Sequence, residues 1–203
     1  MTGWPVLVGY LLGTVPFALL VGGAAVRTAG SGNLGAANVL RVRRTSLGVL
    51  VLVLDLAKGA AAIWVARAAG AEEAMVVSAG AAAIVGHIYP VWLHFRGGKG
   101  VSTTFGVLAA VSPPAALMAG ALCCLGVWMT RYVSVGSLLA LVSLPGLVLL
   151  SDGSRLVAAA AAGAALLVVF RHRSNLARLQ RGTERKLGRG WTEDVAPSGS
   201  TRN

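Results

Sequence analysis

Three segments rich in glycine or basic residues hold most of the side chains that could bind an anion or take part in catalysis. The first is GSGNLGAANVLR, residues 30–41. It begins as G-x-G-x-x-G, but a dinucleotide site needs a preceding β-strand, and we expect an apolar helix there. Glycine lets backbone amides approach an anion closely, and the planar guanidinium group of arginine binds phosphate well. The segment predicts a phosphate site, with a plain basic turn as the alternative. Its candidate residues are Gly30, Ser31, Gly32, Asn33, Asn38 and Arg41.

The second segment, GHIYPVWLHFRGGKGVSTTFG, spans residues 86–106 and surrounds one lysine with glycines. It is not a Walker A loop, because Lys99 is followed by glycine rather than by serine or threonine. A helix expected to start near residue 101 would present free amides and the positive end of its dipole. We favour a phosphate site over a lipid-head anchor, which would need the lysine but not the glycines. The candidates are Gly97, Gly98, Lys99, Gly100 and Thr103.

The third segment, RHRSNLARLQRGTERKLG, covers residues 171–188. His172 and Asn175 are three residues apart, so they share one face of a helix. Glu184 is a single acid among cations, which favours an ion pair. The alternative interpretation is a basic helix that lies on anionic lipid.

The rest of the chain indicates that these segments are positioned by membrane helices. Of the 203 residues, 56% are hydrophobic and only 12% are charged, against about 25% charged in soluble proteins. This composition excludes an ordinary soluble domain, a disordered chain and a collagen-like fibre. We attribute the net charge of +11 to basic loops at a membrane and not to nucleic-acid binding. The adjacent Cys123 and Cys124 have no disulfide or zinc spacing, and no metal site is expected.

The sparse charges divide the chain into seven apolar stretches. Pro113 and Pro114 split the long interval 101–130 into two short legs, because proline removes a backbone donor and disfavours helix before it. The expected fold is an all-α polytopic bundle of about seven transmembrane helices, some of them short. The stretches are 2–26, 46–66, 74–93, 101–112, 115–130, 133–151 and 155–170.

The distribution of basic residues predicts the orientation of the bundle. Most lysines and arginines fall on one side if the N-terminus is outside and the C-terminus is cytoplasmic. All three segments then face the cytoplasm. Residues 1–188 would form one transmembrane domain, and residues 189–203 a disordered cytoplasmic tail.

Two charges lie inside the second apolar stretch. Asp55 and Lys58 are three residues apart, and we interpret them as a structural polar pair that locks helix packing. A functional role for the pair is the alternative. His87 lies near the inner end of the third stretch. The sequence leaves open whether it packs against a neighbouring helix or contacts the substrate.

Together with DLAKG (55–59) and TRYVSVGS (130–137), these segments resemble the bacterial acyl-phosphate:glycerol-3-phosphate acyltransferase family, from Gly13 to Gly188. The family usually has proline at position 34, threonine at 37 and alanine at 102, where this chain has Leu34, Ala37 and Ser102. The His-x4-Asp pattern of the other glycerol-phosphate acyltransferase class is absent from the sequence.

The resemblance implies a seven-helix acyltransferase domain in the bacterial inner membrane, with its active site facing the cytoplasm. It would transfer a fatty acyl group from acyl phosphate to the 1-hydroxyl of glycerol 3-phosphate, giving lysophosphatidic acid and inorganic phosphate. No cofactor or metal is implied. The partners would be the two substrates, the bilayer and the enzyme that makes acyl phosphate, and the chain would act as a monomer.

By match to the family motifs, Arg41 and Lys99 would bind phosphate. The hydroxyl proton would pass to a substrate phosphate oxygen, since no carboxylate–histidine pair is evident. An anion transporter and a structural lipid-binding protein are the competing classes; a transporter would place cations along a path on both faces. The catalytic set implied is Ser31, Arg41, Lys99, His172 and Asn175, and the binding set is Gly30, Gly32, Asn33, Asn38, Gly97, Gly98, Gly100, Thr103, Ser137 and Glu184.

Overall fold

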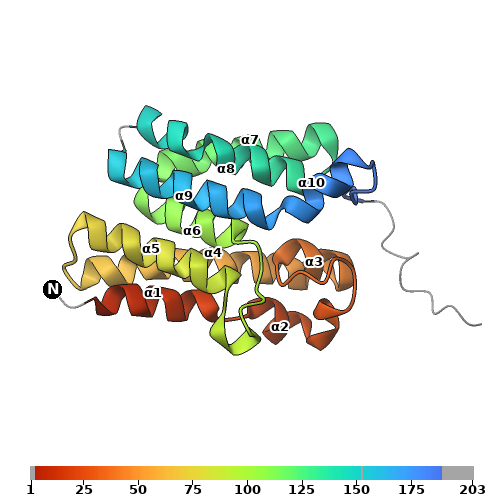
Figure 1. Cartoon of the computed structure of the whole chain (residues 1–203), viewed down its shortest axis with the longest axis horizontal. Coiled ribbons are helices and arrows are strands. Elements are labelled where there is room, and N and C mark those ends of the chain that lie inside the picture. The colour runs from red at the N-terminus through yellow and green to blue at the C-terminus, as the bar shows by residue number, and fades with distance from the viewer. Residues whose placement is uncertain (1–2, 152, 189–203) are drawn as a thin grey trace, which may run out of the picture.

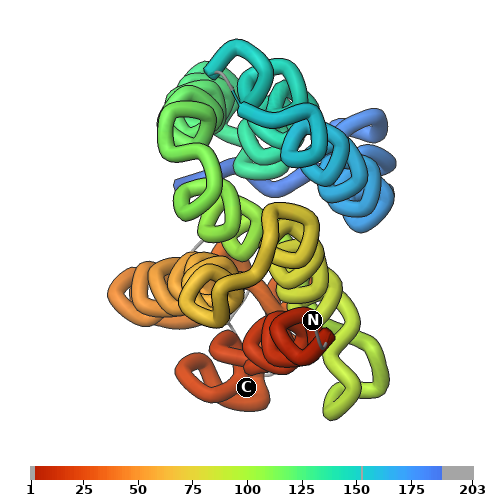
Figure 2. Tube along the Cα trace, turned by 90° about the vertical axis from the view of Figure 1, so that its left-hand side faces the viewer, coloured from red at the N-terminus to blue at the C-terminus, as the bar shows by residue number. Residues whose placement is uncertain are grey.

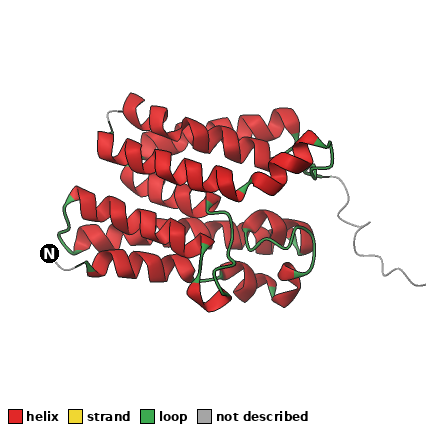
Figure 3. Cartoon of the chain, viewed as in Figure 1, coloured by secondary structure: helices red, strands yellow, loops and turns green. Residues whose placement is uncertain are grey.

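The computed structural model describes residues 3–151 and 153–188, which form helices joined by turns and loops. No β-strand occurs among them (Figure 3), so the all-helical class is confirmed. The tail expected at residues 189–203 lies outside the described residues. The elements are α1 (Trp4–Thr14), α2 (Phe17–Gly22), η1 (Ala24–Arg27), α3 (Ala36–Val42), α4 (Thr45–Ala68), α5 (Glu73–Ile88), η2 (Val91–Leu93), α6 (Val101–Val111), α7 (Pro113–Thr130), α8 (Val133–Leu150), α9 (Arg155–Arg171) and α10 (Arg173–Gln180).

The long helices form two groups that run along a common direction (Figure 1). Helices α1, α4 and α5 pack together in one group, and α7, α8 and α9 form the other. Helix α6 packs on α4 and lies between the groups, as the tube in Figure 2 shows. The short helices α2, α3 and α10 all lie at the end of the bundle away from the N-terminus (Figure 1).

Several segments are long and apolar enough to cross a membrane, which takes about 20 residues for a core about 30 Å thick. Five qualify: Trp4–Gly22, Thr45–Ala68, Glu73–Leu93, Pro113–Thr130 and Val133–Leu150. A sixth results if α9 and α10, bent by 56° at their junction, count as one span. Helix α6 has 11 residues and rises only about 16 Å. The polytopic helical membrane character is confirmed, and the count of seven spans stays a prediction.

Prolines set two breaks between helices. Val15 adopts extended backbone (φ −62°, ψ 116°) directly before Pro16 and separates α1 from α2. The stretch expected as one span over 2–26 is one candidate span, Trp4–Gly22, whose helix is interrupted at Val15 and Pro16. Ser112 separates α6 from α7 directly before Pro113, as the sequence predicted.

Glycines let helix backbones approach closely at two places that position the site. A Cβ atom added at Gly13 of α1 would lie 2.1 Å from the carbonyl oxygen of Ala83 in α5. One added at Gly106 of α6 would lie 1.9 Å from the carbonyl oxygen of Leu56 in α4. Membrane helices use small residues for such contacts, which leave no space for a side chain. The two helices that flank the second segment, α5 and α6, are thereby fixed on α1 and α4.

Gly106→Ala should destabilise the protein, because the new methyl group would collide with the Leu56 backbone. Overpacking costs about 1–3 kcal/mol, and thermal unfolding in detergent should show a lower Tm. Gly120→Ala in α7 is the matched control: nothing lies within 4 Å of its added Cβ, and alanine favours a helix over glycine by about 1 kcal/mol. Equal Tm values for the two variants would contradict the close contact between α4 and α6.

Candidate active site

The first segment folds into a loop that a buried amide side chain organises. Asn38 of α3 is only 1% exposed. Its Oδ1 accepts hydrogen bonds from the amide of Ser31 at 2.8 Å and from Ser31 Oγ at 3.0 Å, and its Nδ2 donates to the Val26 carbonyl at 2.8 Å. Gly30 has a φ of +61°, and a Cβ there would lie 2.4 Å from Asn38 Oδ1. The prediction of Asn38 as a donor to an anion is therefore corrected, because its amide holds the loop. Ser31 itself is exposed.

The second segment packs against the C-terminal end of α5. The amide of Gly97 donates to the Ile88 carbonyl at 3.0 Å, and the amide of Gly98 donates to the His87 carbonyl at 3.1 Å. A Cβ at Gly98 would lie 2.1 Å from His87 Nε2, so glycine is needed for close approach. These two amides already donate to carbonyl groups of α5. They therefore do not form the phosphate cradle predicted from the sequence.

Gly100 and Thr103 serve the start of α6. Gly100 has a φ of +88°, and its carbonyl accepts hydrogen bonds from the amide and the hydroxyl of Thr104, both at 2.8 Å. Thr103 is fully buried, and its carbonyl faces Gly59 of α4. Within residues 3–151 and 153–188 its hydroxyl has no hydrogen-bond partner. Thr103 therefore belongs to the contact between α4 and α6, and its expected phosphate contact stays a prediction.

A chain of polar contacts links the second segment to the third. Lys99 Nζ donates a hydrogen bond to Asn175 Oδ1 in α10. Asn175 Nδ2 donates to Glu184 Oε1 at 2.6 Å, and Ser134 Oγ of α8 donates to the same oxygen at 2.9 Å. Arg178 Nε donates to Glu184 Oε2 at 2.7 Å. Both oxygens of this buried carboxylate are thus bonded, and the ion pair that the sequence indicates for Glu184 is present.

Burial and neighbouring charges set the protonation of this cluster. Burial lowers the pKa of Lys99 to about 8; Glu184 opposes the shift, and Arg178 and Arg41 add to it. Burial also lowers the pKa of Arg41, again opposed by Glu184. For Glu184 burial favours the neutral form, but hydrogen bonds from its three neighbours outweigh it and hold the pKa below its ordinary value. One carboxylate therefore interacts with three cations from separate elements.

His172 and Ser137 have backbone partners. His172 lies at the junction of α9 and α10 and is 3% exposed, with Nδ1 2.8 Å from the Val168 carbonyl. Because a carbonyl oxygen only accepts, Nδ1 carries the hydrogen and Nε2 keeps its lone pair. Ser137 Oγ donates to the Val133 carbonyl at 2.8 Å within α8. Both side chains therefore keep an acceptor for a further hydrogen bond.

A buried ionic cluster adjoins the second segment. Lys58 Nζ lies 2.9 Å from Asp55 Oδ1, so the expected polar pair is present, and Lys58 also donates to the Val15 carbonyl at 2.9 Å. The structure adds His87, whose Nδ1 lies 3.6 Å from the same oxygen of Asp55. The carboxylate–histidine pair that the sequence did not reveal therefore exists. Its outer nitrogen, His87 Nε2, packs against Gly98.

Arg171, the last residue of α9, also contacts the loop that carries Lys99, and the sequence analysis did not name it as a site residue. Its Nη2 donates to the carbonyl oxygens of Gly98 at 3.2 Å and Gly97 at 3.4 Å. The only signal in the sequence was its position next to His172. Its acceptors are backbone groups more than seventy positions away, which no side-chain pattern discloses.

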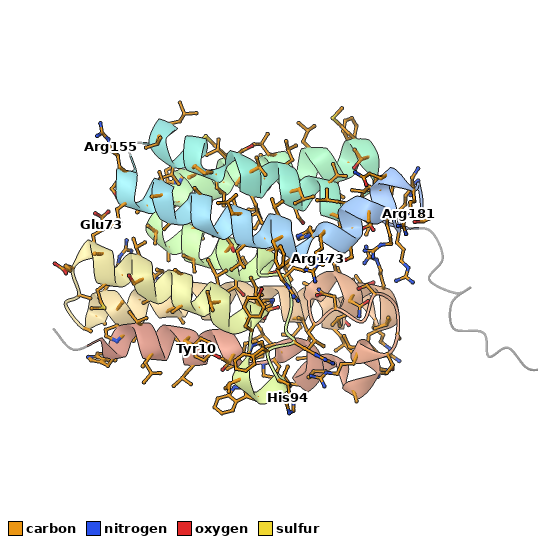
Figure 4. All side chains as sticks on the ribbon, in the orientation of Figure 1. Tyr10, Glu73, His94, Arg155, Arg173 and Arg181 are labelled. Atoms are coloured by element: carbon orange, nitrogen blue, oxygen red, sulfur yellow. The ribbon has the colours of Figure 1, made fainter. Side chains whose placement is uncertain are left out.

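The polar and basic residues gather at one end of the bundle. Arg173 at the start of α10 and Arg181 just after its end lie on one side in Figure 4, whereas Arg155 and Glu73 lie at the opposite end. The amide of Leu187 donates to the Arg131 carbonyl at 2.7 Å and ties the chain after α10 to the start of α8. In the described part of the chain no three His, Cys, Asp or Glu side chains are placed to hold a metal ion. The fold and the cationic cluster define an integral membrane protein with a polar site at one end of its helix bundle.

Comparison with known proteins identifies the family. The family model described as glycerol-3-phosphate acyltransferase matches residues 4–182. A glycerol-3-phosphate acyltransferase of Syntrophotalea carbinolica is 42% identical over 186 residues, which cover 89% of this chain and 95% of the relative. One of Paramagnetospirillum magneticum is 44% identical over 189 residues and covers 89% and 90%. The chain therefore belongs to the glycerol-3-phosphate acyltransferase family.

The fold agrees with solved structures of an integral membrane glycerol 3-phosphate acyltransferase, PlsY. Its glycerol 3-phosphate form has a TM-score of 0.87 at 36% identity and covers 91% of this chain and 94% of that chain. Its lysophosphatidic acid form has a TM-score of 0.84 at 35% identity, with the same coverage.

Glu184→Gln should destabilise the protein at neutral pH, because the amide cannot accept from all three donors. Hydrogen bonds to charged groups contribute about 1.5–3 kcal/mol each, and about 1 kcal/mol moves the Tm of a chain of this size by roughly 2–4 °C. The folded-state pKa is depressed, so this stability is present above the unfolded value and is lost as pH falls. Tm measured across pH should show the wild type approaching the variant in acid. Glu73→Gln, at an exposed acid, is the control; a Tm difference that persists unchanged in acid would contradict the role of the carboxylate charge.

Proposed function

We propose that the protein transfers a fatty acyl group to the 1-hydroxyl of glycerol 3-phosphate and produces lysophosphatidic acid. The observation that carries the proposal is its similarity, over 91% of the chain, to an acyltransferase with solved glycerol 3-phosphate and lysophosphatidic acid forms. The cluster around Lys99 supplies groups suited to this substrate. A half-buried lysine and a nearby arginine can bind a phosphate dianion in a partly desolvated setting, where such contacts are strong.

The donor in this proposal is acyl phosphate, which the family motifs imply. The hydroxyl oxygen of glycerol 3-phosphate attacks the acyl carbon, and the bond between that carbon and the phosphate oxygen breaks. Phosphate leaves with the electron pair. The hydroxyl proton passes to a phosphate oxygen, because His87, the partner of Asp55, packs its outer nitrogen against Gly98. Because phosphate is a good leaving group, the protein's main tasks are to hold both substrates and to stabilise developing negative charge.

The residues divide into three roles. Arg41 and Lys99 bind the phosphate groups, with Ser31 and Asn33 as neutral contacts at the loop surface. Asn175 accepts from Lys99 and orients its ammonium group, and Glu184 fixes Asn175 in turn. Three further residues complete the set. His172 offers its acceptor nitrogen, and Gly97 and Gly98 hold the loop between α5 and α6 that carries Lys99 (the lysine loop) against α5.

The acyl chain lies in an apolar cavity between α5, α6, α8 and α9. This cavity begins at Thr104, next to the loop that carries Lys99, and continues along α6. Its lining is almost entirely apolar, which suits a hydrocarbon chain. Lining residues include Ile84, Thr104, Leu108, Leu144 and Ala161.

The protein lies in the bacterial inner membrane as a monomer with its site facing the cytoplasm. The basic end of the bundle supports this orientation, because cytoplasmic loops carry an excess of Lys and Arg. The same one-sided placement favours an enzyme at the interface over an anion transporter, whose cations would line a path across the membrane. Acyl phosphate would come from the enzyme that makes it.

Purified protein should release inorganic phosphate from acyl phosphate only when glycerol 3-phosphate is present, with an equal amount of lysophosphatidic acid found by mass spectrometry. Acyl-coenzyme A should not replace the donor, and a chelator should leave the rate unchanged. Inverted membrane vesicles should use external glycerol 3-phosphate, whereas sealed right-side-out vesicles should need permeabilisation first. Turnover with acyl-coenzyme A would contradict the donor, and activity of sealed right-side-out vesicles would contradict the orientation.

Arg41→Ala and Lys99→Ala should each lower kcat/KM for glycerol 3-phosphate by roughly tenfold to over a hundredfold, since a charged hydrogen bond contributes about 1.5–3 kcal/mol. Arg41→Lys should recover only part of the loss, because an ammonium lacks the guanidinium fork. Arg44→Ala is the control, because Arg44 is exposed, whereas Arg43 donates to the Gly22 carbonyl at 2.8 Å. Phosphate binding by the two cations is wrong if their alanine variants, once shown to be folded, match Arg44→Ala.

A further inference from the structure

Arg171 joins three elements around the loop that carries Lys99. Its Nη2 donates to the carbonyl oxygens of Gly98 and Gly97 at 3.2 and 3.4 Å. Its guanidinium carbon lies 5.5 Å from the centre of the Tyr89 ring, just after α5. The end of α9 is thereby fastened to the loop and to the end of α5 by one side chain.

The loop is held on its opposite edge by α5. The amides of Gly97 and Gly98 donate to the carbonyls of Ile88 and His87, while their carbonyls accept from Arg171. The two residues before Lys99 are therefore bonded on both sides, and His87 Nε2 occupies the space a side chain at Gly98 would need. This arrangement fixes the direction in which the chain enters Lys99.

We propose that Arg171 is a positioning residue for acyl transfer, which acts through the carbonyls of Gly97 and Gly98 to hold Lys99 in place for the substrate phosphate. The inference rests on the proposed function. A guanidinium group is suited to this task, because its planar face can lie over the Tyr89 ring while Nη2 donates to both carbonyls, whereas an ammonium group is a point charge on a flexible stem.

The charge of Arg171 also acts on Lys99. Together with Arg178 of α10 and Arg41 of α3 it lowers the pKa of Lys99, after burial as the main cause and against Glu184. His172 is the remaining titratable group whose charge interacts with that of Lys99. Loss of the positive charge at position 171 should therefore raise the pKa of Lys99. A neutral packing residue at this position would not have this effect, and the rate of Arg171→Lys separates the charge from the geometry of the contacts with the loop.

The test compares Arg171→Gln, Arg171→Lys and the control Arg173→Gln in the full-length protein. Arg173 is the exposed neighbour that stacks on Phe170 and does not bond the loop. Two readouts are needed: kcat/KM for glycerol 3-phosphate, and the pH midpoint of Lys99 modification by an amine-reactive reagent, followed by mass spectrometry. The wild-type chain has only three lysines, Lys58, Lys99 and Lys186, so each site is resolved.

Arg171→Gln should lower kcat/KM by roughly tenfold to a hundredfold, the range expected for lost charged hydrogen bonds, and should move the Lys99 midpoint to higher pH. Arg171→Lys should keep the wild-type midpoint, because the charge stays, but should recover the rate only in part. Arg173→Gln should change neither readout.

A folded Arg171→Gln variant with kcat/KM within about twofold of wild type and an unmoved Lys99 midpoint would overturn the proposal. If that variant does not fold, a folded Arg171→Lys variant with the full wild-type rate would overturn it equally. If the wild type itself shows no acyl transfer, the proposed function fails. The midpoint of Lys99 modification, which needs no turnover, then still decides whether Arg171 acts on the lysine.

Discussion

The buried carboxylate of Glu184 allows several cations to share one end of an apolar bundle. Charges removed from water need partners, and an unpaired ammonium or guanidinium group would be strongly disfavoured there. Glu184 supplies the compensation through both oxygens, to Arg178 directly and to Lys99 through Asn175. Ser134 adds a link from α8. The positions of α10 and of the lysine loop relative to α8 depend on this one group.

The remaining support for the site comes from backbone contacts. Helices α5 and α6 are set by glycines that admit no side chain at their crossings with α1 and α4. The lysine loop joins these two helices, so its ends are fixed by helix packing and its middle by hydrogen bonds to the end of α5. Lys99 is thus held by a framework made largely of main-chain atoms. A framework of this kind tolerates little change in residue size.

Local features of the sequence were sufficient to predict most of the long helices. Stretches with few or no charges predicted the apolar segments, and Pro113 marked the break between α6 and α7. The break at Pro16 was missed, because it lies within a long uncharged stretch. The motifs brought Lys99, Asn175 and Glu184 into one site, but the reasons for Gly98 and Asn38 were misread. Their partners lie in other elements, so their geometry could not be read from residue type and spacing.

The same limit applies to His87. Its approach to Asp55 joins α5 to α4, and its opposite nitrogen determines what fits at position 98. A histidine in an apolar helix gives no sign of either contact. Long-range contacts of this kind follow from how the helices cross, which the composition and periodicity of each helix leave open.

The pair of Asp55 and Lys58 has a consequence for the biogenesis of the protein. The two residues lie one turn apart on the same helix, so they can neutralise each other as soon as α4 is helical. The segment can then pass from the translocation machinery into lipid as an internal dipole, which avoids much of the cost of about 2.5–3.5 kcal/mol for each separate charge. The Val15 carbonyl belongs to the chain made earlier, and His87 to the chain made later. Helix α4 can therefore settle against α1 before α5 leaves the ribosome, and α5 then completes the cluster.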